Sequence, residues 1–363
     1  MPQIMKIPES PNKSLNSLGS IRRQAVNVSQ AELISAAPLI PGKSLPLVLS
    51  PTVEGVNLVA WAASNRELIA NYLPKHGGIL FRNFQVNGVA EFDQLIRTVS
   101  GELLEYRDRS SPRSQVSGNI YTSTDYPANQ SIFLHSENSY AATWPLKIFF
   151  FCVTPAIQGG ETPIADTRKL FERIDPKIRD RFIHKQVMYV RNFGDGFGLP
   201  WQNVFQSNNP ADVEAFCRSN DIEFEWKESN AYGKPVELRL RTRQVRQAVA
   251  KHPRTGEMVW FNHAAFFHVS SLDATIRESL LAEFQEEDLP HNSYYGDGSP
   301  IEPAVLDEIR AAYQQEMVIF PWQAGDILML DNMLTAHGRM PFVGKRQVVV
   351  GMAEPFSSKD LEC

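Results

Sequence analysis

The chain has 363 residues, of which 43% are hydrophobic and 21% are charged, and its formal net charge at pH 7 is −5. This composition is typical of a globular protein with a sizeable core, and it excludes a largely disordered chain. The slightly acidic balance, with a pI near 6.0, argues against a protein that binds nucleic acid through overall positive charge.

We expect a cytoplasmic protein with no membrane segment. The apolar stretches are much shorter than a bilayer span, and the N-terminus lacks the apolar run of a secretory signal. The three cysteines, Cys152, Cys217 and Cys363, are too few and too scattered for a disulfide framework. This cysteine usage fits a reducing compartment.

The first 45 residues are rich in Pro, Ser, Asn and Gly, and we expect an arm that is partly disordered or packed on the body. Residues 46–363 are predicted to form a single domain with helical insertions. Near its start, apolar residues at helical spacing predict a helix over 57–72. A strand over 78–85 and a helix over about 88–100 are expected to follow.

The middle and the end of the chain consist mainly of short strand-like segments separated by turn residues. Strands are predicted in KIFFFCV, TPIAD, QVMYVRNF, IEFEW, VELRLRT, EMVWF, MVIFPW, DILMLD and RQVVVGMA. Helices are predicted over about 167–183, 210–219, 273–286 and 303–315. Because these strands lack regular alternation with helices, the pattern favours a mainly β jelly roll with flanking helices over a doubly wound sheet.

Two polar side chains, His135 and Glu137, end an apolar run in FLHSENSY. Residues i and i+2 of a strand share a face, so the pair alone is also compatible with two side chains that face solvent. Far along the chain, His337 follows the strand predicted in DILMLD, and Arg346 precedes the last strand. Two imidazoles and one carboxylate leave metal positions open for a cosubstrate and O₂, an arrangement found in non-haem Fe(II) oxygenases. The pattern therefore indicates a metal site at the mouth of a barrel.

Other histidines and two tryptophans are interpreted as structural residues. His76, His184, His252 and His291 have helix-end, helical or turn surroundings, which are typical of surface or capping residues. Trp144 and Trp322 are assigned to the core.

Four segments together resemble the Fe(II)- and 2-oxoglutarate-dependent oxygenases of the taurine dioxygenase and clavaminate synthase superfamily, and within it the branch of the syringomycin-biosynthesis hydroxylase. They are GGILFRNF, FLHSENSYAATWPLKIFFFCVTPAIQGGETPIADTR, WFNHAAFFH and GDILMLDNMLTAHGRMPFVGKRQVVVGM. The resemblance covers roughly residues 45–356. It implies a double-stranded β-helix (jelly-roll, cupin-like) core, and Fe(II), 2-oxoglutarate and O₂ as cofactors.

The resemblance also implies roles for five residues, with His135, Glu137 and His337 as iron ligands and Thr162 and Arg346 as 2-oxoglutarate contacts. A guanidinium can hold a carboxylate through two parallel hydrogen bonds. Arg346 lies nine residues after His337, a shorter interval than is usual in much of the superfamily, which leaves Arg339 as a substitute. Related halogenases have a small residue at the position of Glu137, so a carboxylate there disfavours halogenation.

Substrate contacts are predicted next to the ligand pair and in the segment NHAAFFH. The candidates are Asn138, Tyr140, Asn262, His263 and His268. Each is equally well explained as a packing residue or as a group that orients a ligand.

The predicted function is hydroxylation of an aliphatic C–H bond of an amino acid or amino-acid-derived intermediate in specialised metabolism, either free or bound to a carrier protein. Desaturation, epoxidation or cyclisation of such a substrate needs the same ligands. A basic stretch over 239–254 is typical of a solvated edge, and a second hypothesis makes it the dock of an acidic carrier. A jelly roll with a non-redox metal is the remaining alternative, although structural zinc prefers four protein ligands.

Overall fold

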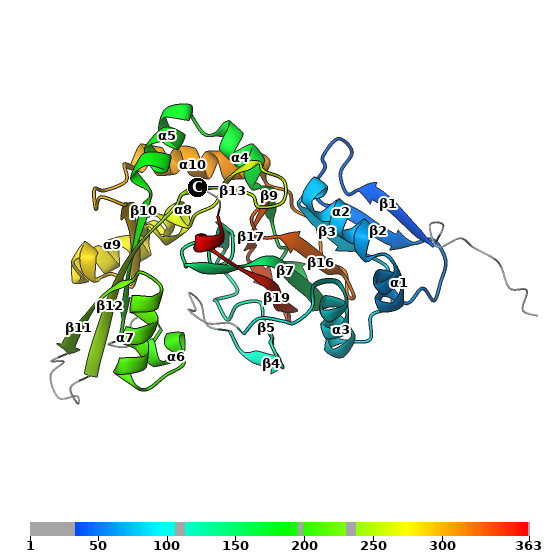
Figure 1. Ribbon diagram of the computed structural model, residues 1–363, viewed down its shortest axis with the longest axis horizontal. Coiled ribbons are helices and arrows are strands. Elements are labelled where there is room, and N and C mark those ends of the chain that lie inside the picture. Colours follow the sequence, from blue (N-terminus) through cyan, green and yellow to red (C-terminus); the bar gives the residue numbers. More distant parts are fainter. Residues whose placement is uncertain (1–32, 106–112, 195–198, 230–236, 362–363) are drawn as a thin grey trace, which may run out of the picture.

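The computed structural model describes residues 33–105, 113–194, 199–229 and 237–361. Residues 1–32 of the predicted N-terminal arm therefore lie outside the described residues. The arm's later part includes strand β1, which pairs with β2 at the edge of a large sheet (Figure 1).

The large sheet has eight strands in the order β1-β2-β3-β16-β7-β19-β5-β4. In that order their bounds are Ile34–Pro38, Leu47–Pro51, Gly78–Phe81, Ile327–Asp331, Thr143–Thr154, Gln347–Ser357, Ile120–Thr122 and Gln115–Ser117. Strand β7 carries the apolar run IFFFCV because both faces of the sheet are covered. Phe149 and Phe151 pack against helices α1–α3 on one face, whereas Phe150 faces a core on the other.

A small sheet in the order β6-β17-β9 lies on that second face. Its strands are Ile132–His135, Thr335–Arg339 and Ile164–Asp166. The ring of His337 in β17 lies 5.1 Å from that of Phe150 in β7, which shows that the two sheets face each other. This arrangement confirms the predicted jelly-roll core.

A separate four-stranded sheet, in the order β11-β12-β10-β15, lies beside the jelly roll with α6 and α7 (Figure 1). Its strands are Glu223–Ser229, Glu237–Arg246, Val187–Phe193 and His291–Tyr295. Two short pairs complete the described strands: β13 Val249–Lys251 with β14 Met258–Trp260, and β18 Phe342–Val343 with β8 Gln158–Gly159.

The helices largely follow the prediction, with two breaks. Their bounds are α1 Leu58–Ser64, α2 Arg66–His76, α3 Val89–Ser100, α4 Thr167–Arg173, α5 Pro176–Lys185, α6 Trp201–Phe205, α7 Pro210–Ser219, α8 Ala264–Phe267, α9 Ala274–Glu283 and α10 Pro303–Glu316, with 3₁₀ turns η2 Val269–Ser271, η3 Glu286–Asp288 and η4 Ser358–Asp360. The helix predicted over 57–72 is interrupted at Asn65, whose side chain donates to Trp61 O. The helix predicted over 167–183 is interrupted before Asp175, which caps α5 through its side chain.

One predicted strand is wrong. In MVIFPW, only Val318 forms a bridge, to Ile164, and the segment otherwise has no regular pairing. It is apolar because Val318, Phe320 and Trp322 fill the core between the two sheets. Trp144 and Trp322 are both buried, as predicted. Among the described residues, no helix combines the length and the apolar character needed to span a membrane.

Candidate active site

Three donor side chains converge where β6 meets β17. His135 ends β6, Glu137 follows two residues later, and His337 lies in β17 directly opposite His135 in the strand register. Their ligand atoms all lie within 4.8 Å of one another. His337 Nε2 is 3.8 Å from Glu137 Oε2. Strand pairing thus brings together residues that are far apart in the sequence.

The ring of His135 is fixed on two sides. Its Nδ1 lies 2.8 Å from the carbonyl oxygen of Phe133, which leaves Nε2 as the ligand atom. The ring of Phe266 stacks on it at a centroid distance of 4.7 Å and an angle of 11°. Burial lowers the pKa of His135 to about 3, and the charge of His337 adds to this effect. The imidazole is therefore neutral near pH 7, as a metal ligand must be.

The carboxylate of Glu137 is buried and ionised. Burial by itself would raise the pKa of Glu137, but the guanidinium of Arg113 and the bond to His337 hold it well below its usual range. Arg113 donates to Glu137 Oε2 at 2.7 Å, and both side chains are almost fully buried. Two imidazoles and one carboxylate are the donor set of non-haem Fe(II) sites, so these residues fit that metal.

Asn332, directly after β16, fixes the backbone of Glu137. Its Oδ1 accepts from Glu137 N–H at 2.7 Å, and its Nδ2 donates to the carbonyl oxygens of Glu137 and Pro145, each at 2.9 Å. Asn332 is fully buried. The sequence pattern does not indicate this role, because an asparagine after a strand is also an ordinary turn residue.

Replacing Asn332 with leucine is expected to weaken metal binding about 10- to 100-fold. This is the usual loss when a residue that orients a metal ligand through hydrogen bonds is removed. The substitution also leaves three buried backbone groups without their partner, at about 1–3 kcal/mol each. Mn(II) affinity by calorimetry and thermal unfolding would measure the two effects. As a control, V213A in the small core around α7 should lower stability without changing Mn(II) affinity. Equal losses of metal affinity in both variants would contradict the role of Asn332.

A polar cavity adjoins two of the donors, His135 and His337, and its empty space, including space open to solvent, is about 340 Å³. Its lining includes His135, His337, Thr162, Arg113, Arg339 and Arg346. Burial and then the nearby Arg339 lower the pKa of Arg346 to about 10, so its guanidinium stays charged near pH 7. The cavity thus presents positive charge and a hydroxyl beside the cluster of donors.

The two candidate arginines differ in what they contact. Arg339 donates to the carbonyl oxygens of three residues in the loop 126–130. Arg346 donates through Nε to Gly160 O at 2.8 Å and through one terminal nitrogen to Ser123 Oγ at 3.2 Å. Gly160 has φ of 74°, and a Cβ there would lie 2.9 Å from Arg346 Cδ, so glycine permits this approach.

A second, larger cavity also borders His135, and its empty space, including space open to solvent, is about 950 Å³. Aromatic side chains of β6 and α8 form much of its wall, with Leu272 and His291 beside them. The residues that line both cavities are Thr124, Ile132 and His135. The imidazole of His135 therefore borders a polar cavity and an aromatic one.

Of the predicted substrate contacts, His263 lies nearest to the donors. Its ring is 5.2 Å from that of His135, and its Nδ1 lies 2.6 Å from Ser139 Oγ. Tyr140 is fully buried and packs on His263 and Phe267.

The other three predicted contacts line neither of the two cavities that border His135. Asn138, in a left-handed conformation with φ of 56°, lines a different cavity near Trp144. Asn262 Oδ1 accepts from Ala264 N–H at the start of α8, and His268 Nδ1 accepts from Ser270 N–H and thereby caps the 3₁₀ turn η2.

Two histidines interpreted as surface or capping residues differ from that interpretation in part. His252 does cap a turn, since its Nδ1 accepts from the N–H groups of Arg254 and Thr255. His252 is buried, and its Nε2 lies 3.1 Å from Asp331 Oδ2. His291 opens β15 and lines the aromatic cavity, with its Nδ1 2.8 Å from Phe267 O. Both corrections have one cause: the residues that cover these rings come from distant parts of the chain.

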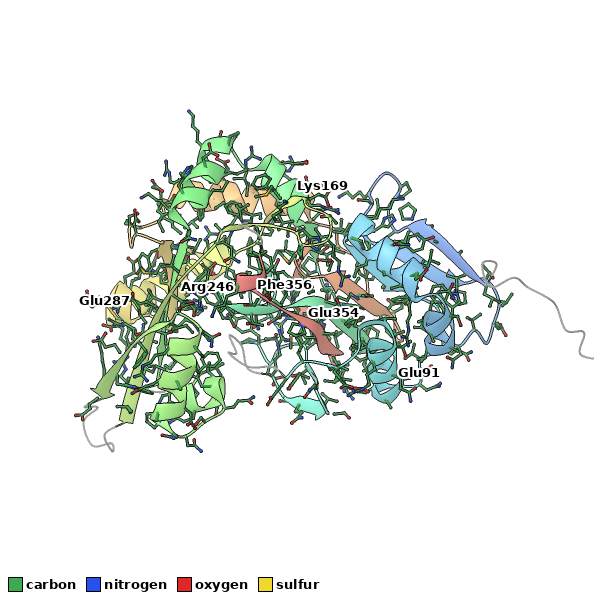
Figure 2. The ribbon with its side chains drawn as sticks, viewed as in Figure 1. Glu91, Lys169, Arg246, Glu287, Glu354 and Phe356 are labelled. Carbon is green, nitrogen blue, oxygen red and sulfur yellow. The ribbon has the colours of Figure 1, made fainter. Side chains whose placement is uncertain are left out.

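The hypothesis of a basic dock over 239–254 is not supported. β12, which carries Arg241, lies inside its sheet between β11 and β10 and is not an edge. Arg241 is 4% exposed and forms ion pairs with Asp288 and Glu287. Arg246 and Glu287 are labelled on this part of the molecule in Figure 2, and Arg246 is buried against backbone carbonyls. Arg241 and Arg246 are thus engaged within the protein and are not presented to a partner.

Comparison with known proteins gives a consistent result. The family described as taurine catabolism dioxygenase TauD, TfdA family matches residues 43–353. The dapdiamide synthesis protein DdaC of Enterobacter agglomerans is 40% identical over 287 residues, covering 79% of this chain and 85% of that protein. A clavaminate synthase-like protein of Arabidopsis thaliana is 25% identical over 347 residues, covering 89% and 100%.

Solved structures also match. PvcB, described as an Fe, alpha-ketoglutarate dependent oxygenase from an isonitrile synthetic pathway, has a TM-score of 0.52 at 14% identity, covering 91% of this chain and 96% of that one. A second structure of PvcB, from Pseudomonas aeruginosa, has a TM-score of 0.51 at 14% identity, covering 88% and 90%. At this identity the likeness shows a shared fold.

Proposed function

Because this chain belongs to the TauD, TfdA family of dioxygenases, we propose that it hydroxylates an aliphatic C–H bond of an amino acid or amino-acid-derived intermediate in specialised metabolism. The protein is an oxidoreductase that uses Fe(II), 2-oxoglutarate and O₂. When bound, ferrous iron and 2-oxoglutarate supply the O₂-dependent oxidation of an unactivated C–H bond. Membership of this family argues against the non-redox alternative. The relative DdaC, named for dapdiamide synthesis, supports a role in specialised metabolism.

His135, Glu137 and His337 are the proposed iron ligands. One observation carries this assignment: their donor atoms, supplied by two paired strands and the turn after β6, lie within 4.8 Å of one another. The carboxylate of Glu137 occupies one metal position and thereby favours hydroxylation over halogenation.

Thr162 and Arg346 are the proposed contacts of the far carboxylate of 2-oxoglutarate. Both line the polar cavity beside the metal ligands, and Thr162 Oγ1 is held by the indole N–H of Trp322 at 3.2 Å. The guanidinium of Arg339 already donates to three carbonyl oxygens through both of its terminal nitrogens. This difference favours Arg346, despite its short interval from His337.

The aromatic cavity is the proposed substrate site, since it opens beside His135 and has room for an amino-acid-derived group. The protein's task there is to hold the target carbon in place and to exclude water. The Phe266 ring, stacked on His135, and the Phe267 ring supply an apolar wall for that purpose.

Filling this cavity with the variant L272W is expected to lower kcat/KM for the substrate about 100-fold, because a misplaced target carbon reacts slowly. The affinities for Mn(II) and 2-oxoglutarate should stay unchanged, and calorimetry would measure both. L281W, on the exposed face of α9, is the matched control. An unchanged kcat/KM in L272W would place the substrate elsewhere.

Succinate release across a panel of free amino acids and carrier-bound aminoacyl thioesters tests the function. We expect release with members of one class, together with a product that has gained one oxygen atom by mass spectrometry. A product that has lost two hydrogens would instead indicate desaturation or ring closure. Wild-type protein that binds Fe(II) and 2-oxoglutarate but releases succinate with no member of the panel would contradict the proposed substrate class.

A further inference from the structure

Arg113 is a buried cation that lies against a proposed metal ligand. Arg113 is 8% exposed, and its guanidinium donates to Glu137 Oε2 at 2.7 Å. It also lines the polar cavity together with Thr162 and Arg346. Arg113 therefore borders both the site proposed for the metal and the site proposed for 2-oxoglutarate.

We propose that Arg113 is an exchangeable counter-ion: it pairs with Glu137 until a divalent metal binds there, and it then pairs with the metal-proximal carboxylate of 2-oxoglutarate. This inference rests on the proposed metal and 2-oxoglutarate sites. It assigns to Arg113 a role in the order in which the two cofactors bind.

The first half follows from the electrostatics of Glu137. A buried carboxylate without a partner is strongly destabilising, so the metal-free protein needs a cation at this position. Arg113 supplies it. A divalent metal bound by His135, Glu137 and His337 supplies more positive charge at the same carboxylate. Arg113 donates to Glu137 Oε2, the oxygen that also lies 3.8 Å from His337 Nε2. A metal held by the three donors and the guanidinium would repel each other and would therefore compete for this oxygen.

The second half follows from the shape and charge of the cavity. 2-Oxoglutarate has two carboxylates, and the one held by Arg346 and Thr162 is the end far from the metal. The other carboxylate must then lie beside the metal ligands, where Arg113 already borders the cavity. A guanidinium displaced from Glu137 has a carboxylate within the same cavity, and such charge-assisted bonds are strong when water is excluded.

The consequence is cooperative binding. Metal releases Arg113 for 2-oxoglutarate, and 2-oxoglutarate then keeps Arg113 away from the metal. Since coupling between two ligands is reciprocal, each should tighten the binding of the other by the same factor.

The test compares the wild type with R113M, which keeps an unbranched, flexible side chain but removes its charge. The probes are Mn(II) alone and 2-oxoglutarate added to the Mn(II)-saturated protein, both measured by calorimetry. We expect R113M to bind Mn(II) alone about tenfold more tightly and 2-oxoglutarate about tenfold more weakly, within the usual range of coupling between two sites. R113K should resemble the wild type in both measurements. The distant variant R173M, at an arginine that pairs with Glu316 on the surface, is the control.

Opposite shifts of two affinities cannot arise from general damage to the fold. Thermal unfolding adds a third readout: R113M should be destabilised without metal and should recover most of the loss in Mn(II). If R113M does not fold, R113Q replaces it, with the same two shifts expected.

Weaker Mn(II) binding by the uncharged variant would overturn the proposal, since Arg113 would then only orient Glu137. Unchanged 2-oxoglutarate affinity would overturn its second half. If wild type and H337A bind Mn(II) equally, the proposed metal site itself fails, and that outcome is distinct from failure of the role of Arg113.

Discussion

Replacing His337 with alanine is expected to remove the metal from the protein and, with it, all 2-oxoglutarate turnover. The variant keeps one imidazole and one carboxylate, and it loses the donor that β17 places opposite His135. Removing a residue that only orients a metal ligand typically weakens metal binding roughly 10- to 100-fold. Removing the ligand His337 itself should weaken it more. Metal analysis after Fe(II) loading, together with succinate release, would measure the two effects.

The variant H135A should give the same result, because its ring is the other imidazole of the site. H184A is the control, since His184 is exposed on α5 and bonds only to the carbonyl of Asp180 among the described contacts. An H337A protein that retains iron at wild-type level would contradict the ligand assignment, and with it the proposed enzyme mechanism.

Replacing Arg346 with alanine is expected to weaken 2-oxoglutarate binding about 100-fold while leaving the metal in place. Hydrogen bonds to charged groups contribute about 1.5–3 kcal/mol each, so losing a paired set costs roughly 3 kcal/mol or more. The KM for 2-oxoglutarate should rise by the same factor, and the metal content should not change. Calorimetry with Mn(II)-loaded protein and steady-state succinate release would provide the two numbers.

The neighbouring variant K345A is the matched control, since Lys345 is exposed and differs from Arg346 by one position. The conservative variant R346K should recover part of the affinity but not all, because an ammonium cannot form two parallel bonds to one carboxylate. If R346A keeps a normal KM for 2-oxoglutarate and R339A does not, the role belongs to Arg339.

Much of the fold could be predicted because its signals are local. Strand β7 has a long apolar run, and α7 has the capping residue Asn209 before a first-turn proline. These elements and the helices α3 and α10 lie close to where they were predicted. The two helix breaks were missed because the apolar spacing continues across Asn65 and Asp175, although both residue types favour helix ends. Asn65 donates to Trp61 O, and Asp175 accepts from Lys177 N–H. MVIFPW was mistaken for a strand because a core-filling loop has the same apolar composition.

The site was only partly predictable, for a different reason. His135, Glu137 and His337 are residue types that commonly bind metals, and they lie in segments that resemble a known family. Asn332 and Arg113 are recognisable only through their contacts with Glu137. Arg113 lies in the segment DRSSPRSQ, which reads as a solvated loop. The prediction of a basic surface around Arg241 failed for the same reason, because the acidic partners of Arg241, Glu287 and Asp288, lie far along the chain in η3.

The position of His135 between two cavities has a consequence for inhibitor design. A single molecule could place a dicarboxylate head in the polar cavity and an apolar tail in the aromatic cavity, passing beside the imidazole of His135. Its head would be recognised wherever a cosubstrate of this kind is used. Selectivity for this enzyme over its relatives would therefore reside in the tail, which meets the side chains contributed by α8 and the start of β15.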